Sequence, residues 1–305
     1  MVSESPLVAR RRLRLALRKA REAKGLTQGQ VAESLYWSLS KVNRIEAGDV
    51  TVSTTDLKAL LDLYNVTDEA VVRQLVADAQ AARRRGWWHD ETAKDHLTPD
   101  LVKLLQYESE ATMIRIYQPS LVPGILQTPS YARSIFESGP PLTPEERAAR
   151  LDIRLRRRTH VFDRPNPPIV LILLDESVLL RERGGDLVMY EQMKELAAYN
   201  ERPNVITRIT PLRGGTMSLL GAFMILDIDD ESAILYQEIG FSDQISEVPG
   251  VVRRYREAFD HVWESSLDEM ASASLIQARV AVLMAALDQH PQPPQRRENG
   301  ATEKP

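Results

Sequence analysis

The chain has 305 residues, of which 43% are hydrophobic and 27% are charged, and this length and composition are ordinary for a globular protein with room for two domains. The lack of cysteine excludes disulfides, cysteine nucleophiles and thiolate metal sites. The formal net charge of −4 excludes a uniformly basic surface, so any contact with nucleic acid must be made by a local patch.

Charge is distributed unevenly along the chain. Residues 1–85 hold 15 lysines and arginines against 10 aspartates and glutamates, whereas the remaining residues hold 24 against 33. A basic region followed by a larger acidic one is typical of a small DNA-binding head on a regulatory body. The N-terminus lacks the apolar core of a signal peptide, and no uninterrupted apolar run approaches the roughly 20 residues of a membrane helix. We therefore expect a cytoplasmic protein with no membrane partner.

The head is predicted to cover residues 10–82, with residues 1–9 as a flexible arm before it. Helical spacing begins around Ala9 and ends at Gly25, with the apolar positions Leu13, Ala16, Leu17 and Ala20 on one side. Arginines surround that stripe at Arg10, Arg11, Arg12, Arg14, Arg18 and Arg21. They form either a solvated face or, for some of them, contacts to phosphate.

The segment 26–48 is typical of two short helices joined by a tight turn. Thr27 and Gln30 have the spacing of a capping box, which predicts the start of the first helix. Ser38 offers an N-cap for the second helix, and Gly48 ends it. Two further helices are predicted from the cap signals at 53–56 and 67–69, which makes five helices in the head.

The second helix of this pair has one apolar edge, formed by Val42 and Ile45, and one polar edge. The polar edge carries groups that bond to base edges, contact thymine methyls and neutralise phosphate. We predict that Leu39, Ser40, Asn43 and Arg44 contact bases, and that Gln28 and Lys41 hold the DNA backbone at the helix N-termini. The full set of candidate DNA-binding residues is Gln28, Ser38, Leu39, Ser40, Lys41, Asn43 and Arg44.

On helix pattern alone, a helical hairpin with a polar outer face and no DNA role is the alternative. However, the order of L-T-Q, a small residue at Ala32, S-x-S and R-I-E-x-G resembles the helix-turn-helix of the Xre and phage-repressor family over roughly residues 10–66. One position departs from that family, because Tyr36 stands in the turn where glycine is usual. A non-glycine residue with positive φ costs on the order of 1 kcal/mol.

Residues 83–97 are predicted to be a hinge and contain the pair Trp87-Trp88. These rings either pack at the domain junction or stack on nucleic acid, and packing is the favoured interpretation. Beyond the hinge, residues 98–288 are predicted to form an α/β body, and the proline-rich residues 289–305 a disordered tail.

The body contains a loop, QPSLVPGILQT over residues 118–128, which two prolines stiffen and which offers Thr128 as a helix cap. Together with Tyr131 and Ala132, it resembles the P-x-L-V-P-G-L-L-Q-T-x-x-Y-A signature of the body domain that follows an Xre head in the actinobacterial WhiJ-like family. Residues 37–46 also fit that family's W-S-x-S-K-V-x-R-I-E motif, so the resemblance spans roughly residues 10–285. It implies a small partner protein bound by the body and control of developmental or secondary-metabolic genes.

Strands are predicted at 114–117, 169–174, 205–210, 221–227 and 233–238, with helices over 98–113, 143–160, 187–200, 251–264 and 267–287. The strand–helix–strand order over 169–210 predicts a parallel crossover. The arginine-rich helix 143–160, with an apolar stripe at Ala148, Leu151 and Leu155, is either a second DNA patch or, as favoured, a packed or partner-facing helix. The expected fold class is an all-α five-helix domain plus an α/β body with a mixed sheet and flanking helices.

These features favour a sequence-specific DNA-binding transcription regulator acting as a homodimer, whose body responds to a partner protein or a small ligand. The alternatives are an antitoxin-like autoregulator of a toxin–antitoxin pair and an enzyme domain fused to a DNA-binding head. The sequence lacks a Walker loop, a G-x-S-x-G elbow and a G-x-G-x-x-G turn, so we expect no enzyme activity, catalytic residues, cofactor or metal.

Overall fold

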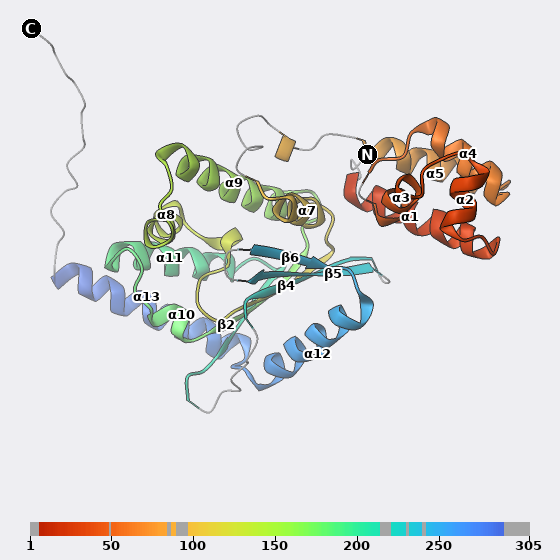
Figure 1. Ribbon diagram of the computed structural model, residues 1–305. Coiled ribbons are helices and arrows are strands. Elements are labelled where there is room, and N and C mark those ends of the chain that lie inside the picture. The colour runs from red at the N-terminus through yellow and green to blue at the C-terminus, as the bar shows by residue number, and fades with distance from the viewer. Residues whose placement is uncertain are drawn as a thin grey trace, which may run out of the picture.

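A computed structural model of the chain describes residues 6–48, 50–83, 87–89, 97–213, 221–229, 232–239 and 242–289. Figure 1 shows the helices of the head gathered at one end of the molecule, beside a body built on a sheet. The predicted fold class is confirmed.

The head consists of α1 (Pro6–Ala23), α2 (Gln28–Ser34), α3 (Leu39–Ala47), α4 (Thr54–Tyr64) and α5 (Glu69–Ala81). Its core is a separate cluster in which Leu13 and Leu17 of α1 meet the inner faces of the other four helices. Because α1 begins at Pro6 and Ala9 is fully buried, the flexible arm predicted over residues 1–9 is wrong for residues 6–9. Residues 1–5 lie outside the described residues.

The short helix η1 (Trp87–His89) follows the head. The helices of the body are α7 (Pro99–Glu108), η2 (Gly124–Leu126), α8 (Pro129–Ser138), α9 (Pro144–Phe162), α10 (Ser177–Leu180), α11 (Asp186–Tyr199), α12 (Pro249–Ser265) and α13 (Glu269–Gln289). Thr98, Thr128 and Thr143 are the N-caps of α7, α8 and α9, and each accepts a hydrogen bond from a backbone N–H in the first turn of its helix. Each cap is followed by a proline at the start of the helix, where its missing N–H costs nothing.

The six strands are β1 (Met113–Gln118), β2 (Ile169–Asp175), β3 (Val205–Thr210), β4 (Phe223–Asp229), β5 (Ser232–Ile239) and β6 (Ser242–Ser246). They form one mixed sheet in the order β3-β2-β1-β4-β5-β6. The strands β2 and β3 are parallel, as the crossover predicts, β1 also pairs with β2 in parallel, and the remaining pairs are antiparallel. The edge strand β6 is absent from the sequence prediction.

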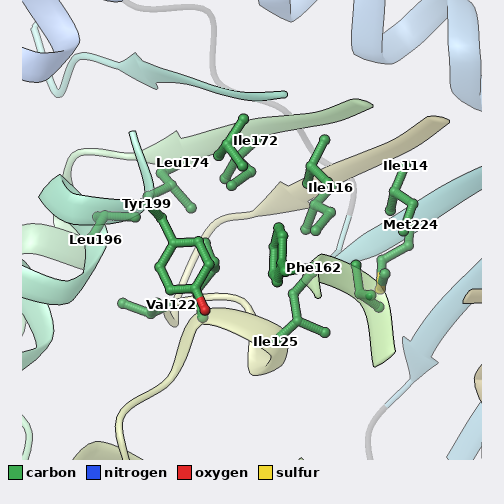
Figure 2. Packing of buried hydrophobic residues seen from close by; sticks show 14 of the residues in the cluster. Ile114, Ile116, Val122, Ile125, Phe162, Ile172, Leu174, Leu196, Tyr199 and Met224 are labelled. Atoms are coloured by element: carbon green, nitrogen blue, oxygen red, sulfur yellow. The ribbon is translucent and has the colours of Figure 1, made fainter. Parts of the chain in front are cut away.

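Both faces of the sheet are covered, which explains why β2 is apolar almost throughout. On one face, Ile116 and Met224 pack with Ile125 of the 118–128 loop and with α9, α11 and α13 (Figure 2). On the other face, Tyr117 and Phe223 pack against α12.

Two helices of the body differ from their predicted packing. The inward face of α9 carries Ile153, Val161 and Phe162 rather than the stripe Ala148, Leu151 and Leu155. Between Ile153 and Val161, Arg157 and Arg158 pair with carboxylates of other helices. Helical periodicity over α13 predicts an apolar stripe that includes Met270, Ile276, Leu283 and Met284. Ile276 and Leu283 face the core as this stripe predicts, whereas Met270 and Met284 are exposed. Arg279 of the same helix donates to the carbonyl of Leu179.

Among the described residues, α13 is the one helix whose length and mean hydropathy would allow it to cross a membrane. Core helices of soluble proteins can have the same length and composition, and only 17% of the apolar stretch of α13 is buried. Since α13 contacts α11 and β3 along the body, its length and composition are weak evidence for a membrane span.

Head and body are in direct contact. Residues of α1 lie against α7, and Glu247 of the body forms ion pairs with Arg11, at 3.4 Å, and with Arg14. The hydroxyl of Tyr107 donates to the same carboxylate at 2.8 Å. The first helix of the head is thus tied to the body by charge as well as by packing.

The two tryptophans lie at this junction. Trp88 is buried, and Trp87 stacks on His160 of α9 with ring centroids 5.0 Å apart. The favoured packing interpretation is therefore confirmed. The predicted hinge residues 84–86 and 90–96, and the predicted tail beyond Gln289, lie outside the described residues.

Candidate nucleic-acid interface

The helices α2 and α3 begin at the predicted caps. Thr27 Oγ1 accepts from the backbone N–H of Gln30 at 3.2 Å, and the Gln30 side chain accepts from the Thr27 N–H at 2.8 Å, which completes the capping box. Ser38 Oγ accepts from the Lys41 N–H at 3.2 Å. Gly48 ends α3 with a φ of 81°. Local hydrogen bonding thus sets where α2 and α3 begin and where α3 ends.

Tyr36 takes the positive φ that the turn requires. Its φ is 55°, and its side chain is 97% exposed. The backbone N–H of Trp37 donates to the Ala32 carbonyl at 2.8 Å, so the turn keeps its hydrogen bonding without glycine. Because the exposed ring packs against nothing that compensates, the backbone strain is a net cost to the head.

Exchanging Tyr36 tests this strain. Tyr36→Val places a β-branched residue at positive φ and should lower the free energy of unfolding of the head by about 1–2 kcal/mol. Tyr36→Gly should stay within about 0.5 kcal/mol of the parent, because relief of strain offsets the added freedom of the unfolded chain. Both variants lose the ring, so the difference in stability between them reports backbone strain rather than ring contacts. Amide hydrogen exchange of Val31 and Val42 measures the stability of the head in each variant. Equal losses in both would contradict this account.

A buried polar network fixes the inner edge of α3. Glu46, on the edge formed by Val42 and Ile45, accepts from Arg21 Nε at 2.6 Å and from Arg21 Nη2 at 3.0 Å. Arg21 also donates to the carbonyl of Leu26 at 2.7 Å. The hydrogen bond that Arg21 donates to Glu46 is the largest cause of its raised pKa, against the opposing effect of burial.

Tyr64 lies near this network. Burial, with the charge of Glu46 second, raises the pKa of its hydroxyl to about 12. The network as a whole was not predicted, although an acid beside Ile45 on an apolar edge was a usable signal. Its consequence is that α1 and α3 are held together by a charged pair as well as by apolar packing.

The opposite edge of α3 points to solvent. Leu39 is 51% exposed, and Ser40, Asn43 and Arg44 are exposed. Within the described part of the chain, the side chains of Ser40, Asn43 and Arg44 have no hydrogen bond or ion pair to the protein. These four predicted base-contacting residues therefore lie together on one free surface, with donors and acceptors available to a ligand.

The two predicted backbone-contacting side chains have internal partners. Gln28 donates to Glu46 at 2.9 Å, which leaves the second N–H of its amide for a phosphate. Lys41 donates to Asp56 at 2.7 Å and lies over the ring of Trp37, 3.7 Å from its centroid. A phosphate contact by Lys41 would therefore compete with these two interactions.

The partner of Lys41 is stabilised in its charged form. Burial favours the neutral carboxyl, but hydrogen bonds from Lys41 and Ser53 and the charge of Lys41 together hold the pKa of Asp56 below its ordinary value. Asp56 therefore fixes Lys41 beside the N-terminus of α4.

Most arginines of α1 form hydrogen bonds or ion pairs with other parts of the protein. Arg12 donates through Nε to the fully buried Asp78 of α5 at 2.8 Å, and Gln74 donates to the same carboxylate at 2.9 Å. Arg10 donates to the carbonyl of Ala82, and Arg18 pairs with Glu22. Arg18 and Glu22 form an exposed pair one turn apart, as the solvated-face interpretation predicts. The other five arginines, including Arg11, Arg14 and Arg21 described above, connect α1 to other parts of the protein, which neither interpretation had anticipated.

Family comparisons agree with this division. Residues 12–75 match a helix-turn-helix domain. Residues 101–278, more than half of the chain, match the domain of unknown function DUF5753. The chain belongs to the DUF5753 family. No curated protein matches this DUF5753 chain. The helix-turn-helix match and the exposed polar edge of α3 together indicate a DNA-binding regulator.

Proposed function

We propose that this DUF5753 protein is a sequence-specific transcription regulator of the Xre type and that α3 is its reading helix. The observation that carries the proposal is the contrast between the two edges of α3. One edge is fixed by Val42, Ile45 and the Arg21–Glu46 pair, and the other presents Ser40, Asn43 and Arg44, which have no hydrogen-bond or ion-pair partner among the described residues. A rigid helix with free donors and acceptors on one side fits the major groove, where Arg44 is suited to donate to guanine O6 and N7.

The proposal extends to a homodimer in the cytoplasm. A single head buries little surface on DNA, and proteins with this motif gain affinity by reading two half-sites about 34 Å apart. Two copies of α3 related by a two-fold axis would read a palindromic operator.

In this proposal the body, residues 98–288, controls the head by binding a small partner protein or ligand, and it acts by binding rather than by catalysis. The WhiJ-like resemblance of the 118–128 loop supports a protein partner. The contact of Glu247 with Arg11 and Arg14 supports communication between body and head, because a shift of this carboxylate would change the ion pairs that hold α1 to the body.

Selection of binding sites from random duplex DNA by the full chain tests the proposal. The expected result is enrichment of one palindromic motif with half-site centres about 10 base pairs apart. A chain in which Ser40, Asn43 and Arg44 are all replaced by alanine should enrich nothing, because these replacements leave the buried edge of α3 intact. Failure of the parent chain to enrich any sequence would refute the proposed function.

A further inference from the structure

The 118–128 loop closes over a cavity in the body. The cavity has a volume of about 140 Å³ and lies between this loop, the strands β1, β4 and β5, and the helices α8 and α9. Ile116, Val122, Ile125 and Met224 provide apolar walls, and Figure 2 shows these four side chains in the buried cluster between sheet and loop. A cavity of about 150 Å³ is large enough for benzene in another protein, so this volume suits a ligand of similar size.

Two guanidinium groups of α9 line the polar side of this cavity, and they differ in their partners. Arg157 donates to Glu108 of α7 through Nε at 3.0 Å and through Nη2 at 2.7 Å. Burial opposes its charge, but the charge and hydrogen bonds of Glu108 raise the pKa of Arg157 above its ordinary value. Arg157 is therefore already neutralised by a bidentate carboxylate.

Arg154 has no such partner. It donates to the side-chain oxygen of Gln127, and its guanidinium carbon lies 5.0 Å from the centroid of the Phe136 ring. No carboxylate of the described residues forms an ion pair with it, and Glu238, which lines the same cavity, does not come within pairing distance. Burial, with the charge of Arg157 next, lowers the pKa of Arg154 to about 10. Its charge is thus poorly compensated, and an anion in the cavity would relieve this.

The loop that covers Arg154 is held in place on both sides. The Gln127 amide donates to the carbonyl of Val122 at 2.6 Å. The fully buried Gln192 of α11 donates to Leu126 at 2.9 Å and accepts from the Thr128 N–H at 2.8 Å. A Cβ at Gly124 would lie 3.7 Å from both guanidinium groups, so the absence of a side chain there leaves space directly over them.

We propose that this cavity binds a small organic carboxylate, with the carboxylate on the guanidinium of Arg154 and a short apolar group against Ile116, Ile125 and Met224. A planar guanidinium with free N–H groups matches a carboxylate with two parallel hydrogen bonds. A phosphate dianion fits less well, because Arg157 is occupied by Glu108 and Glu238 adds negative charge to the wall. The inference does not depend on DNA binding by the head.

Calorimetric titration of the full chain tests the site, with benzoate as the probe and benzamide as its neutral isostere. We expect benzoate to bind at least ten-fold more tightly than benzamide, since a hydrogen bond to a charged group contributes about 1.5–3 kcal/mol. Inorganic phosphate should bind at least ten-fold more weakly than benzoate. A tetrapeptide ending in leucine, compared with its C-terminal amide, shows whether the carboxylate of a peptide chain also enters.

Substitutions of residues that line the cavity test whether benzoate binds there. Arg154→Met should weaken benzoate at least ten-fold, whereas Arg150→Met, which removes an exposed arginine one turn earlier on α9, should change its affinity less than two-fold. If Arg154→Met does not fold, Gly124→Ala decides, because its methyl group enters the cavity at ordinary contact distance and should weaken benzoate several-fold. The proposal is overturned if neither benzoate nor the peptide acid binds, if phosphate binds as tightly as benzoate, or if neither cavity variant weakens binding.

Discussion

Replacing Glu46 by alanine is expected to lower the free energy of unfolding of the head by about 3–5 kcal/mol, the usual cost of removing one partner of a buried ion pair. The side chains of Arg21 and Glu46 are only 11% and 5% exposed, so the arginine would keep its charge largely shielded from water, with the half-exposed carboxylate of Glu22, 3.6 Å away, as its remaining counter-charge. Gln28 would lose its acceptor at the same time. The start of α2 and the end of α3 should loosen together.

Amide hydrogen exchange of the buried residues of α1 and α3 in the full chain measures this loss, since it reports the opening of the head separately from that of the body. Glu33→Ala is the matched control, because it removes an exposed carboxylate from α2 and should change stability by less than about 0.5 kcal/mol. The double variant Arg21→Met, Glu46→Leu should recover most of the loss, because apolar replacement of both partners leaves no buried charge. A Glu46→Ala protein as stable as the Glu33→Ala control would show that the pair does not hold the head.

Replacing Arg44 by alanine is expected to weaken operator binding by about 1–3 kcal/mol, or roughly 5- to 150-fold in Kd, while the fold is kept. Arg44 is exposed and bonds to nothing in the described part of the chain, so its loss leaves no buried group unsatisfied. Arg73→Ala is the control of equal charge, since Arg73 lies on α5, away from the reading edge, and is 71% exposed. If both variants weaken binding equally, Arg44 contributes only charge.

The parts of the fold that were predicted from the sequence are those set by local chemistry. The caps Thr27, Ser38 and Thr143 act on backbone groups within three residues, so their spacing alone specifies where a helix starts. The strand β2 was also predicted from local sequence, because a run of apolar residues without alternation indicates a strand that is buried on both faces. The polar, exposed edge of α3 follows from helical periodicity.

The parts that were missed depend on distant residues. Arg12 and Asp78 are 66 positions apart, and no local pattern distinguishes an arginine that pairs with a buried carboxylate from one that has no partner. The strand β6, SDQIS, is polar enough to resemble a loop and becomes a strand because β5 offers it a pairing edge. In the same way, the cavity at Arg154 exists only because the loop, α9 and the sheet meet there.

A titration of wild-type and Arg44→Ala protein against single-base variants of the selected operator tests most directly whether α3 reads bases. The wild type should discriminate by about 1–3 kcal/mol at one position in each half-site, and Arg44→Ala should lose discrimination at that position alone. An Arg44→Ala protein that keeps the wild-type base preference at every position would contradict base reading by Arg44 of α3.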